Sequence, residues 1–391
     1  MNSPIIGQIF EYQALKRPKQ ACLLYSDSVH KFSQYSSLTY KQVNDITNNL
    51  AQQFSQHISQ MNNTVVCLLA NNSVDYLLTL YALLKLNVTV FPLSTRNSPA
   101  AIVDLVIKTK ASHLFISEQY WSIVEQLKNL TLESVKLDEL DITSLQQSTL
   151  SFPKFAETED RIQMIFHSSG STSFPKPIHF LGKNILDYYD IFTSVNSEYW
   201  KENDTVLLWG SLFHIFPFAI TAVVFQAGGT LALPLSATYP PSPAALLANI
   251  QVEQLTKLVS LPILLEKLID EMKNNKDIIN WTPLMKFDFI MYGGATCPDI
   301  ICQELVDNGV NLIAHYGSTD LKSDLKCCRH EMIIHLNHDI KLLNERSADL
   351  RQSNDLQAVY EDESTVTGPI IYFISTATRF HQLDRQIIDH I

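Results

Sequence analysis

The stretch IFHSSGSTSFPKPIHF, Ile165 to Phe180, places small hydroxyl residues and one glycine between an apolar segment and a lysine flanked by prolines. The apolar segment is typical of a buried strand. Glycine and short hydroxyl residues leave backbone N–H groups unshielded, so that these can converge on phosphate oxygens, and Lys176 adds a compensating charge. The spacing is not that of the common P-loop, because prolines stand on both sides of Lys176. The stretch predicts a phosphate-binding loop, with a Ser/Thr-rich surface turn as the alternative.

The chain on both sides of this stretch alternates strand-like and helix-like segments. Strands are predicted over residues 64–70, 88–93, 112–117, 161–169, 204–210, 287–294 and 311–317. Helices are predicted over residues 37–59, 72–87, 183–195, 218–229, 261–275 and 298–309, and from Ser98 onward. Such alternation indicates an α/β fold with parallel sheets. Residues 120–160 are predicted to be a polar connection, and the last part of the chain has a strand signal only at 368–375.

Charge and composition exclude several classes of function. The net charge of −11, from 29 basic and 40 acidic residues, argues against a general nucleic-acid or anionic-membrane surface. The six cysteines form no CxxC pair, which is typical of reduced thiols in a cytoplasmic protein. We expect no secretory signal, because the N-terminal segment lacks a basic region followed by an unbroken apolar run. We also expect no membrane span, because His214, Pro217 and Gln226 interrupt the most apolar window.

The segment SSGSTSFPK, residues 168–176, resembles the phosphate-binding signature of the adenylate-forming (AMP-binding) superfamily. That superfamily comprises acyl-CoA synthetases, adenylation domains of peptide synthetases, and luciferases. Further segments resemble it in the same order: LTYKQVNDITNNLA, the region 65–117, SLFHIFPF, MYGGATCP and AHYGSTD. The resemblance implies an adenylation core over residues 1–320, with parallel-sheet α/β subdomains at roughly 30–150 and 160–320. Residues 321–391 are expected to be a remnant or diverged β-rich tail.

The resemblance also implies a reaction, in which a carboxylate attacks the α-phosphate of ATP·Mg²⁺ to give an acyl-adenylate and pyrophosphate. The implied phosphate-binding residues are Ser168, Ser169, Gly170, Ser171, Thr172, Ser173 and Lys176. The implied adenine side comprises Gly293, Gly294, Ala295, Tyr316 and Gly317, with Tyr316 stacking on the base. Catalytic roles fall to His214, Thr319 and Asp320. Asp320 stands where the family has a glutamate linked to Mg²⁺, so it is the expected metal ligand, one methylene shorter.

The segment around His214 bears on the substrate. By resemblance it lines the acyl pocket; a core histidine with a backbone partner is the alternative. Adenylation domains that accept α-amino acids usually carry an aspartate shortly after the aromatic residue here, and LFHIFPF has no acidic residue. We therefore expect a small carboxylic acid, aryl or acyl, without an α-amino group.

Several departures from the family pattern support a second hypothesis. Ser173 replaces a glycine, Thr367-Gly368 is followed by Pro369 instead of the ribose-binding aspartate, and no small C-terminal domain follows. The chain therefore resembles a truncated core. The first hypothesis is an adenylate-forming enzyme. The alternative is an impaired nucleotide- or acyl-binding protein, or a fragment of a larger multidomain synthetase or reductase with carrier or reductase domains. An unrelated α/β protein is the third reading. The sequence does not identify the acceptor of the acyl group, which could be a thiol of CoA or phosphopantetheine.

Overall fold

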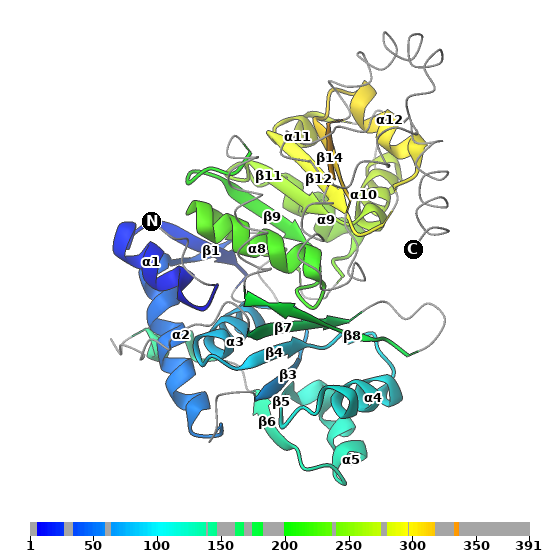
Figure 1. The fold of residues 1–391 in the computed structure, drawn as a ribbon. Coiled ribbons are helices and arrows are strands. Elements are labelled where there is room, and N and C mark those ends of the chain that lie inside the picture. Colours follow the sequence, from blue (N-terminus) through cyan, green and yellow to red (C-terminus); the bar gives the residue numbers. More distant parts are fainter. Residues whose placement is uncertain are drawn as a thin grey trace, which may run out of the picture. The chain divides into compact units, whose positions relative to one another are not determined.

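The computed structural model describes residues 6–26, 34–58, 64–137, 140–146, 161–167, 174–182, 199–236, 240–274, 280–295, 297–316 and 332–335. This part of the chain forms two compact units (Figure 1). The first extends to Val259 and the second begins at Ser260. Helices and strands alternate through both units. The expected α/β fold is confirmed, and the subdomain boundaries stay a prediction.

A six-stranded sheet in the described part of the first unit has the strand order β6-β5-β3-β4-β7-β8. Its strands are β3 Val65–Leu69, β4 Thr89–Pro92, β5 His113–Ser117, β6 Glu133–Leu137, β7 Ile162–His167 and β8 Pro177–Leu181. Neighbouring strands are parallel except β7 and β8, which form an antiparallel pair. The carboxyl ends of β4 and β7 therefore meet at one edge of the sheet.

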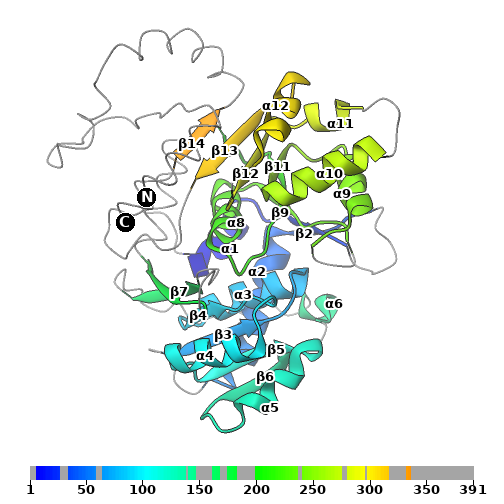
Figure 2. The same ribbon diagram turned by 90° about the vertical axis from the view of Figure 1, so that its right-hand side faces the viewer.

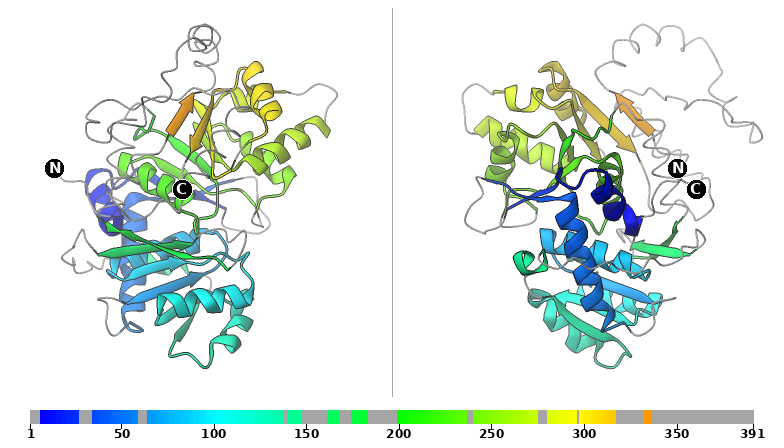
Figure 3. Two further views of the ribbon diagram at one scale, coloured as in Figure 1. Left: turned by 45° about the vertical axis from the view of Figure 1, so that its right-hand side comes forward. Right: turned by 90° about the vertical axis from the view of Figure 1, so that its left-hand side faces the viewer.

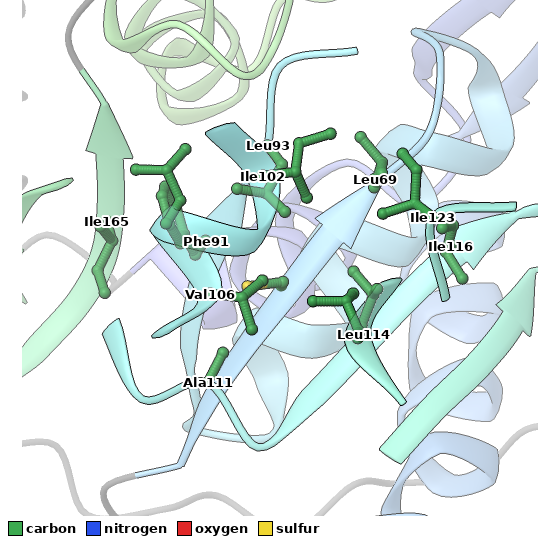
Figure 4. Close-up of a cluster of buried hydrophobic side chains, with 13 residues drawn as sticks. Leu69, Phe91, Leu93, Ile102, Val106, Ala111, Leu114, Ile116, Ile123 and Ile165 are labelled. Atoms are coloured by element: carbon green, nitrogen blue, oxygen red, sulfur yellow. The ribbon is translucent and has the colours of Figure 1, made fainter. Parts of the chain in front are cut away.

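Helices cover both faces of this sheet, because its strands are apolar on both sides. On one face, α4 (Pro99–Thr109) and α5 (Val124–Leu127) pack on a cluster of buried side chains that includes Phe91, Leu114 and Ile165 (Figure 4). On the other face, Phe54 of α2 (Tyr40–Ser55) meets Phe115 of β5 edge to face, with ring centroids 4.8 Å apart. Successive side chains of β5 therefore point into two separate cores, with Leu114 in the first and Phe115 in the second.

The first unit contains a second group of strands in the order β11-β9-β10-β1-β2. These are β1 Ala21–Tyr25, β2 Ser36–Thr39, β9 Thr205–Trp209, β10 Thr230–Ala232 and β11 Lys257–Ser260. The first unit also holds η1 Ile6–Gln8, α1 Ile9–Lys16, α3 Val74–Lys85, η2 Glu118–Ile123, α6 Ile142–Leu145, α8 Ile215–Ala227 and α9 Pro243–Ile250. Helices α1 and α2 lie side by side (Figure 3). Phe10 of α1 contacts Phe225 of α8, which ties the N-terminus to this group.

Side-chain caps set the N-termini of three helices, and those of α3 and α4 lie at the starts that the sequence predicts, whereas α2, predicted from residue 37, begins at Tyr40 because Ser36–Thr39 form β2. The side chain of Thr39 caps α2 and forms a capping box with Gln42, Ser73 caps α3, and Ser98 caps α4. Each side-chain oxygen accepts from a backbone N–H that has no partner within its helix. These caps explain why the predicted starts of α3 and α4 agree with the structure.

The second unit is built on β12 (Phe289–Gly293) and β13 (Leu312–Tyr316), which pair in parallel, with β14 (Met332–His335) antiparallel to β13. Its described helices are α10 Pro262–Asn274, α11 Thr282–Met285 and α12 Asp299–Asp307. Helix α12 lies beside β13 (Figure 2). The β12–α12–β13 order is the strand–helix–strand arrangement that the sequence predicts for 287–317.

The structure differs from the sequence prediction in the connection between the first five strands and β7. Residues 133–137 form β6 at the edge of the six-stranded sheet, although they were predicted to belong to a polar connection. The strand is half exposed and carries Glu133 and Lys136, so it lacks the apolar run that identifies a buried strand. The predicted helix at 183–195 and strand at 368–375 lie outside the described residues.

Candidate functional site

The quoted stretch begins and ends on a β-hairpin. His167, the last residue of β7, pairs with Pro177, the first residue of β8. Lys176 directly precedes this pair and is exposed, whereas Pro175 beside it is buried. The hairpin pairing fixes both ends of the predicted phosphate-binding loop at the same place and holds Lys176 at its base.

His167 connects this hairpin to the end of β4. Its imidazole is buried, and Nε2 accepts a hydrogen bond from the backbone N–H of Ser94 at 3.1 Å. Nδ2 of Asn97 lies 3.4 Å from the same nitrogen. Because Nε2 accepts from a backbone donor, the ring carries its proton on Nδ1. The neutral imidazole thus fastens the segment that follows β4 to the start of the phosphate-binding loop.

The ring of Phe213 extends this cluster toward the predicted acid pocket. It stacks on His167 with an interplanar angle of 11° and a centroid distance of 6.4 Å, and it lies 4.5 Å from the ring of His214. His214 stands at the N-terminus of α8, and its backbone N–H donates to the carbonyl of Ser211 at 3.0 Å. The structure therefore brings two predicted site regions together within one unit, although they are far apart in the sequence.

The side chain of His214 is neutral at physiological pH. Burial lowers its pKa to about 4, and electrostatic interactions with the neighbouring His167 and Arg96 act in the same direction. A neutral imidazole can donate one hydrogen bond and accept another, but it cannot balance the charge of a carboxylate. Burial of His214 fits both the pocket and the core interpretation, so its pocket role stays a prediction, in which an anionic substrate would need a separate cation.

The segment before His214 has a fixed backbone and buried side chains. Asn72 holds it with two hydrogen bonds, donating to the carbonyl of Gly210 at 2.7 Å and accepting from the N–H of Leu212 at 3.1 Å. A Cβ on Gly210 would lie 2.4 Å from the ring of Pro217, so only glycine fits there. In contrast, the buried Oγ of Ser211 has no hydrogen-bond partner among the described residues. A buried hydroxyl without a partner costs about 1–3 kcal/mol, which is typical of a position that serves a ligand.

In the second unit, the predicted adenine side lies at the ends of two neighbouring strands. Gly293 at the end of β12 pairs with His315 of β13, next to Tyr316. Gly294 follows with a φ of +81°, and both it and Ala295 are exposed. Because Gly294 has no Cβ and turns the chain away, the backbone here leaves a bare surface that fits a flat ring such as adenine. The described residues of this edge are therefore compatible with the nucleotide.

The other predicted site residues cannot be placed in the same way. Ser168, Ser169, Gly170, Ser171, Thr172, Ser173, Gly317, Thr319 and Asp320 lie outside the described residues, as does the side chain of Tyr316. Their roles stay predictions. Among the residues that are described, no three His, Cys, Asp or Glu side chains come together as a metal cluster, and the expected Mg²⁺ ligand Asp320 is not one of them.

Sequence reasoning missed Ser94, Arg96 and His167. These residues follow or terminate β4 and β7, and only the strand order of the folded sheet shows that these two strands are neighbours. Elsewhere, the four cysteines in the described ranges are buried and unpaired. The helices of those ranges are all too short or too polar to cross a bilayer.

A family model described as AMP-binding enzyme matches residues 10–341. The chain is 29% identical over 272 residues to an adenylate-forming reductase of Aspergillus terreus, covering 65% of this chain and 24% of that protein. It is 24% identical over 344 residues to a carboxylic acid reductase of Neurospora crassa, covering 81% of this chain and 31% of that protein. The chain thus spans about a quarter to a third of the length of these relatives.

Solved structures agree on the fold. The luciferase-like enzyme of the mealworm Zophobas morio matches with a TM-score of 0.69 at 19% identity, over 88% of this chain and 77% of that one. An o-succinylbenzoate CoA synthetase of Bacillus subtilis, solved in complex with its acyl-adenylate intermediate, matches with a TM-score of 0.66 at 17% identity. That match covers 86% of this chain and 62% of the synthetase chain. At these identities the likeness concerns the fold alone.

Proposed function

This chain belongs to the family of AMP-binding enzymes, and from that premise we propose that it activates a carboxylic acid without an α-amino group to an acyl-adenylate, with release of pyrophosphate from ATP. The observation that carries the proposal is the stacking of Phe213 on His167. It joins the segment expected to contact the acid to the base of the loop expected to hold the triphosphate.

The reaction needs a weak nucleophile held in line with a phosphorus atom and charge neutralised around it. A carboxylate oxygen forms a bond to the α-phosphorus, the bond from that phosphorus to the bridging oxygen breaks, and pyrophosphate leaves with the electron pair. Lys176 at the hairpin base would hold the triphosphate, and the neutral His214 would orient the carboxylate by a hydrogen bond. Mg²⁺, when bound, supplies further positive charge at the phosphates, with Asp320 as the proposed ligand.

The substrate class rests on the chemistry of the segment Ser211–Phe218. It contains no acidic residue that could pair with an ammonium group. The curated relatives include proteins named adenylate-forming reductase and carboxylic acid reductase. Both observations support a simple aryl or acyl acid. If this chain is part of a longer protein, we propose that the rest of that protein contains carrier or reductase domains. The acyl group would then pass to a thiol such as CoA or phosphopantetheine.

A second candidate function is nucleotide or acyl binding without turnover. It is favoured by the sequence departures at Ser173, Asp320 and Pro369, each at a position where the family signature has another residue. Under this alternative the protein binds ATP, but no acid makes it exchange pyrophosphate.

Pyrophosphate exchange separates the two candidates. The full chain is given ATP, Mg²⁺, labelled pyrophosphate and a panel of aryl, acyl and amino acids, beside Lys176→Ala. Acid-dependent exchange that falls at least about 100-fold in the variant supports the enzyme, since loss of one group that stabilises the transition state typically has this effect. The exposed Lys128→Gln, which removes the same charge from the surface, serves as the control. Exchange that responds only to amino acids would contradict the proposed substrate class.

A further inference from the structure

The segment Ser94–Asn97, which follows β4, is held against the root of the phosphate-binding loop by more than one bond. The N–H of Ser94 and the amide of Asn97 both approach Nε2 of His167, as described above. The N–H of Arg96 donates to Oγ of Ser94 at 3.2 Å, which closes a tight turn. The backbone position of Arg96 is therefore fixed, while its side chain is exposed.

The guanidinium of Arg96 is a free cation at the predicted acid side. It forms no ion pair with any carboxylate in the described ranges, even though the protein has an excess of acidic residues. Its charge reaches His214, where it contributes to lowering the pKa. Because no acidic side chain of the described residues pairs with Arg96, its charge is available there to an anion from solution.

The other polar groups of the acid side are neutral. His214 is uncharged at physiological pH, and the buried Ser211 offers only a hydroxyl. A carboxylate that leaves water needs a cation as well as hydrogen bonds, because uncompensated burial of its charge is very costly. A guanidinium matches a carboxylate in shape, since its two parallel N–H groups can each bond one oxygen.

We propose that Arg96 recognises the carboxylate of the acid substrate, on the turn that His167 fastens beside Phe213 and His214. The inference rests on the proposed function and adds a specificity-determining residue to it. Lys176 at the hairpin base remains the cation assigned to the phosphates, so the two cations serve different reactants.

Exchange kinetics on Arg96→Gln and Arg96→Lys test the inference. For Arg96→Gln we expect the KM of the acid to rise about 10- to 100-fold, the effect of losing one charged hydrogen-bonded contact. We expect the KM of ATP to change by less than about twofold, since the lost contact lies on the acid. The KM of the acid for Arg96→Lys should lie between those of the wild type and Arg96→Gln, because lysine keeps the charge but lacks the two parallel N–H donors. Lys128→Gln is the matched control for a lost surface charge, and the unfolding temperature of each variant reports intact folding.

A second readout separates recognition from a structural role. The primary amide of the preferred acid is tested as a competitive inhibitor. The wild type should prefer the acid to the amide, and Arg96→Gln should lose most of that preference while binding of the amide is unchanged. An unchanged KM for the acid would overturn the inference. A rise confined to the KM of ATP would also overturn it, by assigning the guanidinium to the triphosphate.

The inference and the proposed function fail in different ways. If no acid supports exchange in the wild type, the proposed function fails. Benzoate and hexanoate are then titrated into the wild type and Arg96→Gln by calorimetry in the presence of ATP. Binding that is lost only in the variant retains Arg96 as a carboxylate-binding group, and equal binding or none to the wild type overturns it.

Discussion

The acid side of the first unit and the strand ends of the second unit present two different kinds of surface to a ligand. Around His167, Phe213 and His214, aromatic side chains are fixed by stacking and hydrogen bonds, and the two imidazoles add polar groups. At Gly293 and Gly294 the side chains are absent, and the feature is a backbone with a positive φ. Substitutions should therefore act through lost contacts in the first region and through backbone conformation in the second.

One ion pair from each unit allows a comparison of burial. In the first, Lys257 pairs with Asp204, and their side chains are only 3% and 7% exposed. In the second, Lys273 pairs with Glu304 at 2.7 Å with exposures of 42% and 23%. A buried carboxylate that loses its partner keeps its desolvation cost, whereas an exposed one is screened by water.

The largest expected effect comes from breaking these pairs one at a time. Lys257→Met should lower the free energy of unfolding by about 3–5 kcal/mol, because Asp204 is left buried and charged. Lys273→Met should lower it by less than about 1 kcal/mol. Urea denaturation of both variants measures the difference. Equal losses would show that burial does not distinguish the two pairs.

A pair of glycines tests the role of the backbone in the second unit. Gly294 and Gly309 both have a φ of +81°, but only Gly294 lies at the predicted adenine edge. Alanine at either position should cost about 1–2 kcal/mol of stability, because a Cβ disfavours this conformation. Only Gly294→Ala should also weaken ATP binding, measured by calorimetry at a temperature where both variants are folded. Equal ATP affinity in the two variants would remove the adenine assignment.

Removing the hydroxyl of Ser211 should have a smaller effect on stability, and this effect should be neutral or stabilising. Ser211→Ala removes a buried group without a partner, so the stability of the free protein should stay the same or rise by up to about 1 kcal/mol. Pyrophosphate exchange should nevertheless fall about 10-fold, if the hydroxyl bonds to the substrate.

Ser260→Ala in the second unit is the matched control for this substitution. Oγ of Ser260 donates to the carbonyl of Leu261 at 3.0 Å, so its removal should destabilise the protein by about 1 kcal/mol. A Ser211→Ala variant that is destabilised to the same extent would show that the Ser211 hydroxyl is a structural group.

The titration of His214 should affect stability only at acidic pH. Its pKa falls from an ordinary 6.5 to about 4 on folding, so the unfolded chain binds more protons between these values. Its contribution to stability should therefore be complete above pH 6.5 and be lost as the pH falls toward 4. His214→Gln should flatten this part of the pH–stability curve. An imidazole resonance of His214 that titrates near 6.5 in NMR spectra would contradict the burial argument.

The sequence predicted the alternating α/β order and the starts of α3 and α4 because local signals determine them. Serine and threonine caps fix where α2, α3 and α4 begin, and apolar runs identify the central strands. The edge strand β6 was missed because half-exposed edges lack such a run. His214 was predicted by resemblance, whereas His167 and Arg96 acquire significance only through the meeting of β4 and β7. A contact between distant segments leaves no local signal.

The central claim is that the hairpin with Lys176 at its base holds a nucleoside triphosphate. Calorimetric measurement of ATP·Mg²⁺ binding tests this claim most directly. The wild type should bind ATP, Lys176→Ala should bind it about 10- to 100-fold more weakly, and Lys128→Gln should match the wild type. Equal affinity in the wild type and Lys176→Ala, or no binding of ATP to the folded wild type, would contradict the account.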